Sequence, residues 1–229
     1  MTVEFNEHDG SLRLTQTEFD RLVSHRPGAA LMRATAATTE GPHPILAPGL
    51  AVVTESVCRM DIELTDGDGE RKRGDGWVAP HGAALLLDVD GGLRDFVALP
   101  APLLPAALAR LVRLGPRPMM EDGPLYIGDD AHQALRSGTV PAVTVPEPGP
   151  LAAALTTGRW RYWAVTATWR SLDGRYVSAA VRVLDTAEGW CRFEKIDGDV
   201  YATPCNATAI WRELTLLLPD EVAPVGGPV

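Results

Sequence analysis

Residues 12–23, LRLTQTEFDRLV, combine a short alternating strand with the start of a helix. In LRL a polar residue separates two apolar ones, as in a strand with one buried face. Thr15 and Glu18 then fit a capping box, in which each side chain bonds the backbone N–H of the other residue at a helix N-terminus. Phe19 and Leu22 follow at helical spacing. The stretch therefore predicts a strand followed directly by an amphipathic helix.

A second stretch of the chain repeats this pattern. Residues 125–136, LYIGDDAHQALR, again place a short strand before a helix. Leu12 and Leu125 lie 113 positions apart, and so do Leu22 and Leu135. Self-similarity at a constant offset is typical of an internal duplication. We therefore expect two similar halves related by a pseudo-twofold axis.

The same order of elements follows in both halves: a linker, several strands joined by short turns, and a final amphipathic helix. Glycine-containing turns such as Asp90-Gly91-Gly92 predict antiparallel pairing of the strands that they join. Helices beside an antiparallel sheet make an α+β fold. We expect a central antiparallel β-sheet with flanking helices, in a single domain over residues 1–220. Its halves would span about 11–115 and 124–219, and residues 221–229 would form a flexible C-terminal tail.

Individual elements can be placed from local patterns. Residues 58–65 alternate apolar and polar side chains, which predicts a strand. Residues 66–76 are rich in glycine and charge, which predicts a long loop before a strand at Trp77. Asn206 is a good N-cap for the last helix, and helical spacing predicts that this helix buries Trp211.

Composition narrows the function classes. The 229 residues carry a formal net charge of −9, which disfavours binding to the phosphate backbone of nucleic acids. No apolar run approaches the roughly 18 residues of a membrane span, and the acidic start lacks the apolar core of a secretory signal. The three cysteines, Cys58, Cys191 and Cys205, form no CxxC pair, which suits a reduced cytosol. We expect a cytoplasmic protein with no nucleic-acid partner and no membrane insertion.

The sequence contains no recognisable catalytic or metal-binding motif. GxSxG, HExxH, Walker A and GxGxxG patterns are absent, and the five histidines share no metal-ligand spacing. Asp61 and Glu63 share one strand face, but no second element is identifiable that would raise the pKa of either. We therefore expect no enzyme, no cofactor and no metal. A carboxylate pair that converged with Arg94, Arg161 or Arg182 in a cleft would instead favour an unrecognised active site.

Two further features are candidates for binding. Arg71-Lys72-Arg73 is a basic tract between acidic residues, which suits either an acidic partner or an ordinary solvated loop. Trp163 and Trp169 share one face of a strand and Trp160 lies on the other, so aromatic side chains occupy both faces of the sheet. One face must be core. The second is either an exposed partner surface or is also covered by helices.

Three strings together carry a family resemblance. They are LRLTQTEF at 12–19, FVALP at 96–100 before a Leu/Ala-rich helix, and VRVLDT at 181–186 before Gly189-Trp190 and the last helix. This combination resembles the EspG proteins, cytosolic chaperones of the ESX (type VII) secretion systems of actinobacteria. The resemblance implies an α+β fold with pseudo-twofold halves. It also implies binding of PE–PPE heterodimers at the hydrophobic helical tip of the PPE protein.

By position, the resemblance places the partner surface on three elements. These are the loop from Asp66 to Gly76, the strand near Trp163 and Trp169, and a helix near Leu155 or Trp211. The expected partner-binding residues are Asp68, Glu70, Arg71, Lys72, Arg73, Trp163, Trp169 and Trp211.

Two alternatives to this interpretation remain open. The chain is short for the family, so a WXG-type helical protein is an alternative partner to a PE–PPE-like pair. A homodimeric small-ligand-binding or sensor protein without catalysis is the alternative function, because duplicated sheets often form a cleft at their pseudo-twofold axis.

Overall fold

The computed structural model describes residues 4–6, 11–24, 46–121, 123–139 and 149–218. The first half contains β1 (Glu4–Asn6), β2 (Ser11–Leu14), α1 (Gln16–Val23), α3 (Ala47–Thr54), β3 (Cys58–Asp66), β4 (Arg71–Ala79), β5 (Gly82–Asp88), β6 (Arg94–Leu99) and α4 (Leu104–Leu111). The second half contains β7 (Leu125–Tyr126), α5 (Gly128–Ser137), α6 (Pro150–Thr156), β8 (Trp160–Arg170), β9 (Tyr176–Thr186), β10 (Gly189–Ile196), β11 (Asp199–Cys205) and α7 (Ala207–Leu216).

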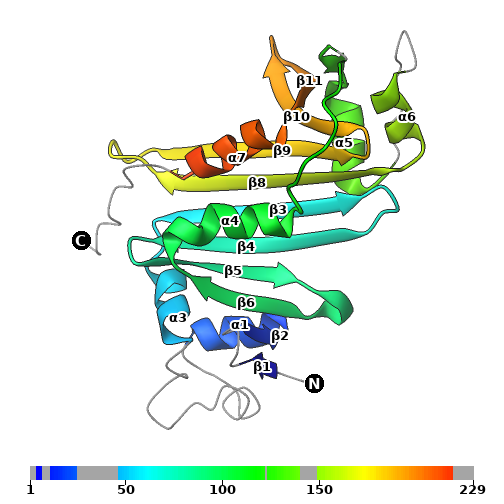
Figure 1. Cartoon of the computed structure of the whole chain (residues 1–229). Helices are drawn as coiled ribbons and strands as arrows, with labels where there is room; N and C mark the ends of the chain where they lie inside the picture. The colour runs from blue at the N-terminus through cyan, green and yellow to red at the C-terminus, as the bar shows by residue number, and fades with distance from the viewer. Residues whose placement is uncertain (1–3, 7–10, 25–45, 122, 140–148, 219–229) are drawn as a thin grey trace.

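The strands of the described residues form one antiparallel sheet in the order β1-β2-β6-β5-β4-β3-β8-β9-β10-β11-β7 (Figure 1). β3 and β8 meet at its centre, where residues 58–66 pair with residues 161–169. Outward from this pair, β4, β5, β6 and β2 follow on one side, and β9, β10, β11 and β7 follow on the other. The expected antiparallel α+β fold with two related halves is confirmed. The half boundaries stay a prediction, and the tail at 221–229 lies outside the described residues.

The strand–helix unit that opens each half forms as its sequence predicts. The Thr15 backbone N–H donates to Glu18 Oε2 at 3.0 Å, and Thr15 Oγ1 accepts from the Glu18 backbone N–H at 3.3 Å. In the second half, α5 ends at Gly138, whose φ of 75° is the left-handed conformation that glycine adopts without strain. Leu22 and Leu135, which share the constant offset, are both buried.

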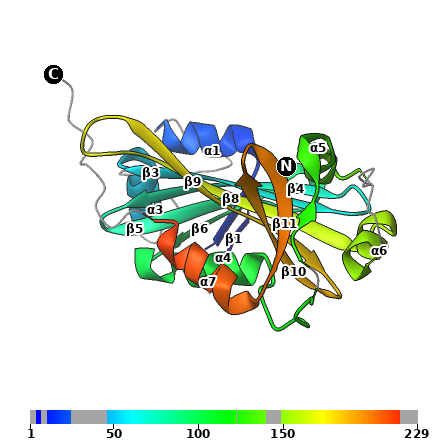
Figure 2. The same cartoon turned by 90° about the horizontal axis from the view of Figure 1, so that it is seen from above.

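Helices cover the two faces of the sheet differently (Figure 2). α4 and α7 lie on one face, over a continuous core that includes Trp163 and Trp190. On the other face, α1 and α3 cover one core and α5 and α6 cover a second, separate core. Between these two cores the middle of β3 presents Asp61 and Glu63. This uncovered, polar middle, which we call the open face, is where the two halves adjoin.

The prediction of a long loop over residues 66–76 is wrong. Only residues 67–70 connect β3 to β4, and Arg71 already pairs with Thr65 across the two strands. Gly74 lies inside β4 at a point where the neighbouring strand comes close. A Cβ at this position would lie only 2.7 Å from Leu87 Cδ2, so glycine fits where a larger residue would clash. Glycine in a strand often marks such a close approach rather than a loop. The basic tract therefore lies on the sheet and not at a hairpin tip.

The segments that precede the central strands of the two halves contain the helices α3 and α6, and α6 includes Leu155, near which the resemblance implies a helix. Both carry a proline in their first turn, where its missing N–H costs no hydrogen bond. None of the helices in the described ranges has both the length and the apolar character required to cross a membrane.

Candidate functional site

A cavity of about 900 Å³ opens on the open face, between α1 of the first half and α5 of the second. Cross-strand neighbours share a face of a sheet, so two rows of them make the cavity floor. The rows, read from β4 across β3 and β8 toward β9, are Arg73–Glu63–Ala164–Arg182 and Asp75–Asp61–Thr166. The floor is therefore built by both halves and is strongly charged.

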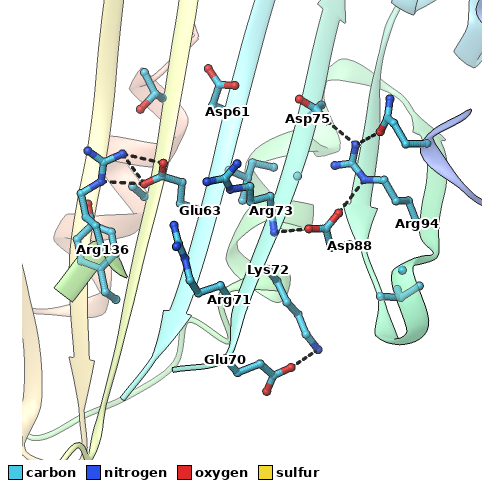
Figure 3. Close-up of a pocket in the computed structure, with 18 of the residues that line it drawn as sticks. Asp61, Glu63, Glu70, Arg71, Lys72, Arg73, Asp75, Asp88, Arg94 and Arg136 are labelled. Carbon is cyan, nitrogen blue, oxygen red and sulfur yellow. Dashed lines mark hydrogen bonds and ion pairs between the residues drawn. The ribbon is translucent and has the colours of Figure 1, made fainter. Parts of the chain in front are cut away.

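Ion pairs hold several of these side chains in place (Figure 3). Arg136 of α5 binds Glu63 through two nitrogens, with Nη2–Oε1 at 2.7 Å and Nε–Oε2 at 3.0 Å. Arg94 of β6 lies 2.7 Å from Asp75 Oδ2 and 2.8 Å from Asp88 Oδ1, and only 11% of its side chain is exposed. Such paired arginine–carboxylate groups fix the walls of the cavity geometrically.

The two carboxylates of β3 experience opposite environments. The hydrogen bond from Arg136 lowers the pKa of Glu63, and the positive charges of Arg73 and Arg71 lower it further. Burial raises the pKa of Asp61, the charges of Asp75 and Glu63 raise it further, and Arg59 opposes them. Glu63 is therefore firmly ionised, whereas the charged form of Asp61 is disfavoured.

No family model matches the sequence, and no curated protein matches it. Among solved structures, the chain is similar to the Mycobacterium tuberculosis type VII secretion system chaperone EspG5, determined in complex with the PE25–PPE41 dimer. The TM-score is 0.59 at 12% sequence identity, over 92% of this chain and 97% of the EspG5 chain. The chain shares the EspG5 fold. At this identity the likeness concerns the fold alone, and the fold is the one that the three strings predict.

The EspG-like fold places half of the predicted partner-binding residues around the cavity. Glu70, Arg71, Lys72 and Arg73 all line it. Asp68 lies in the turn between β3 and β4, where its Oδ1 accepts from the Glu70 backbone N–H at 3.1 Å. It lines a separate surface cavity of about 700 Å³ beyond that end of the strands.

Trp163 is a core residue, so its prediction as a partner-binding side chain is corrected. Its side chain is 0% exposed and packs in the core beneath α4 and α7. Trp160, on the opposite face of β8, is 5% exposed beneath α5 and α6. Helices thus cover both tryptophan-bearing faces at these positions, which was the second of the two alternatives drawn from the sequence.

Trp169 and Trp211 lie elsewhere on the molecule. Trp169 is half-buried, and it pairs with Cys58 at the end of β8 far from the β3–β4 turn. Eight residues separate it from Arg161 at the other end, or about 27 Å of strand. Trp211 on α7 is 40% exposed, contrary to the prediction that the helix buries it. The predicted residues therefore form two regions rather than one.

Exposed apolar side chains occur at the β8–β9 hairpin and on α7. Leu172 and Tyr176, at the end of the β8–β9 hairpin, are 72% and 82% exposed. Leu216 of α7 is 77% exposed and lines a groove with Val181 of β9. We call Trp169, Leu172, Tyr176, Trp211 and Leu216 the apolar end. Exposed apolar clusters of this kind are typical of protein interaction sites.

Sequence reasoning did not identify Asp75, Asp88 and Arg136 as residues of this site. One signal was present: Arg71, Arg73 and Asp75 alternate with Lys72, Gly74 and Gly76, which is the period of a strand. No local signal joins Arg136 to Glu63, because 73 positions separate them.

Asp61 and Glu63 do share a cavity with Arg94 and Arg182, whereas Arg161 lies outside it. This is part of the convergence that would favour an active site. In the described ranges, however, no three His, Cys, Asp or Glu side chains gather as metal ligands. Burial also raises the pKa of the Cys58 and Cys205 thiols to about 11, so neither is a thiolate nucleophile at neutral pH.

The environment of His132 on α5 predicts that the free energy of unfolding depends on pH. His132 of α5 lies 3.3 Å from the Tyr162 hydroxyl, and burial lowers the pKa of His132 to about 4. In the unfolded chain the histidine pKa is about 6.5, so below that pH the unfolded state binds a proton that the folded state excludes. The contribution of neutral His132 to the free energy of unfolding is therefore fully present above pH 6.5 and is lost as the pH falls toward 4.

The variant His132→Gln removes this titration. Urea unfolding of the wild type and of His132→Gln at several pH values between 7 and 4 measures the difference. We expect the wild type to lose more unfolding free energy over this window than His132→Gln loses. Parallel pH profiles for the two proteins would contradict a half-buried His132 that stays neutral in the folded state.

Proposed function

We propose that the protein is a cytoplasmic chaperone or adaptor that binds a helical type VII secretion substrate and keeps it soluble for secretion. The supporting observation is the EspG5 fold over 92% of the chain, since EspG5 was determined in complex with a PE–PPE dimer. We propose a PE–PPE-like heterodimer as the substrate, with a WXG-type helical protein as the alternative, and no catalytic activity.

The two regions described above suit a helical partner in different ways. The apolar end offers exposed aromatic and aliphatic side chains, which contribute most of the binding energy when a partner covers them. Residues 70–73 and Asp68 offer charges toward the other end of the same strands, which steer and orient a partner rather than hold it. A long helical protein spans both regions, because 18 helical residues already cover about 27 Å.

The first test is a pull-down with the tagged full-length chain from the cytosol of the native host, with mass spectrometry of what is bound. We expect near-stoichiometric recovery of a helical, PE–PPE-like or WXG-type protein. The recovered partner is then expressed and titrated against the purified chain. Recovery of this chain alone, with no helical partner, would overturn the chaperone proposal.

A substitution in the apolar end tests, in the same titration, whether this region contacts the partner. We expect Trp211→Ala to weaken partner binding tenfold or more, as truncation of a central interface aromatic does. Ile196→Ala is the matched control, because Ile196 is 45% exposed, close to the 40% of Trp211, and lies on β10 away from the apolar end. Equal affinities for the two variants would remove Trp211 from the interface.

The second candidate function, a homodimeric small-ligand-binding or sensor protein, draws its support from the cavity. Its floor combines charged side chains of both halves, as expected for a cleft where duplicated halves adjoin. A concentration-dependent dimer without any helical partner, and stabilisation by a small metabolite, would favour this function over the chaperone.

A further inference from the structure

We propose that the cavity on the open face binds a small oxyanion, a carboxylate or phosphate group, between Arg73 of β4 and Arg182 of β9. The site shares Arg73 with the charged region of the chaperone proposal, and Arg182 also lines the groove beside Leu216. The proposal stands on three observations: how the charges around the cavity are paired, where the unpaired charges lie, and what lies between them.

The charges around the cavity are equal in number but unequally paired. Six carboxylates and six cationic side chains line it. Three of the cations, Lys72, Arg94 and Arg136, form ion pairs with five of the carboxylates. Within the described residues, the other three guanidinium groups form no ion pair. They belong to Arg71, Arg73 and Arg182.

The one carboxylate of the cavity that is left over is Asp61. Asp61 forms no ion pair with any described residue, and burial with two neighbouring negative charges disfavours its ionised form. Glu63 is ionised, but Arg136 occupies both of its oxygens. Three guanidinium groups of the cavity therefore have no carboxylate partner among the described side chains.

Arg73 and Arg182 stand at the two ends of one cross-strand row, with Glu63 and Ala164 between them. Ala164 lines the cavity with its short side chain at the edge of the core beneath α5 and α6, where it is 4% exposed. Figure 3 shows Arg73 and Arg136 on opposite sides of Glu63, with Arg71 below it. Guanidinium forks that face one space suit planar or tetrahedral oxyanions, which accept two parallel N–H bonds.

The test is a calorimetric titration of inorganic phosphate, and separately of citrate, into the full-length protein at constant ionic strength. We expect saturable binding of at least one of the two, and which one binds distinguishes a phosphoryl from a carboxylate ligand. Arg73→Gln and Arg182→Gln should each weaken that binding tenfold or more. Arg212→Gln is the matched control, because Arg212 is exposed on α7 at the other face of the sheet.

Two further variants separate a built site from general electrostatics. Ala164→Leu fills the floor without changing any charge and should weaken binding about tenfold. Asp61→Asn removes the remaining carboxylate and should strengthen binding about threefold. If Ala164→Leu fails to fold, Arg182→Gln and Asp61→Asn still test the proposal. Both change side chains at the cavity surface, where substitutions disturb folding less than in the core.

The proposal is overturned if neither anion binds saturably, or if Arg212→Gln weakens binding as much as Arg182→Gln does. Its failure is distinguishable from failure of the chaperone proposal. If Arg182→Gln loses anion binding but still forms the helical complex, the result bears on the anion site and not on the chaperone proposal. If no helical partner is found, the chaperone proposal fails, and the anion titration can still be measured.

Discussion

Replacement of Trp163 by alanine is expected to lower the free energy of unfolding by about 3–5 kcal/mol, as removal of a large buried aromatic does. Trp163 lies on β8, one of the two central strands, with no exposed surface, and packs in the core that α4 and α7 cover. Domains of this kind are stable by only about 5–15 kcal/mol. The variant should therefore be partly or fully unfolded at ordinary temperatures.

The effect should come from packing and not from a hydrogen bond. Trp163 Nε1 is buried and has no acceptor among the described residues. Trp163→Phe, which keeps a ring and removes that unpaired donor, should therefore cost much less than Trp163→Ala. Urea unfolding of both variants measures this, with the half-exposed Trp211→Ala as a control that should change stability by less than about 1 kcal/mol. A small effect of Trp163→Ala would mean that the central core is not closed.

Replacement of Gly67 by alanine is expected to destabilise the fold by about 2–3 kcal/mol, as overpacking against backbone does. Gly67 lies in the turn between β3 and β4, and its N–H donates to the Trp160 carbonyl oxygen at 2.9 Å. A Cβ at Gly67 would lie 2.0 Å from the carbonyl oxygen of Gly158, in the turn before β8. Backbone atoms cannot rotate away as a flexible side chain does, so one of the two turns must move.

Gly123→Ala is the matched control, because a Cβ at Gly123 would meet no atom of the described residues within 4 Å. We expect it to leave the urea midpoint close to that of the wild type. A Gly67→Ala midpoint equal to that of Gly123→Ala would show that the two turns separate at little cost.

The elements that the sequence predicted correctly depend on contacts close along the chain. The capping box of Thr15 and Glu18 joins residues three positions apart, and the alternation from Cys58 onward is a property of one strand. The start of β4 was missed because Gly74 and Gly76 resemble a loop in isolation. Their place in a strand depends on Leu87 and Met60, which lie on the neighbouring strands.

The candidate site was predicted only in part for the same reason. Arg71 and Arg73 were identified as a tract, but Arg136 reaches Glu63 from a helix of the other half. Whether a tryptophan lies in the core or at the surface depends on which helices cover its face. Alternation places Trp163 on a face but does not say what covers that face.

The central pairing of β3 with β8 has a consequence for how the cavity can vary. Two separate identical chains that met along this edge would carry the same side chains on both walls, because an isologous contact repeats every residue. In one continuous chain each wall is encoded separately. The wall from α1 presents Gln16, whereas the wall from α5 presents Arg136. A single polypeptide thus allows an asymmetric recognition surface that can distinguish the two ends of an asymmetric ligand. A symmetric dimer would bind both ends alike.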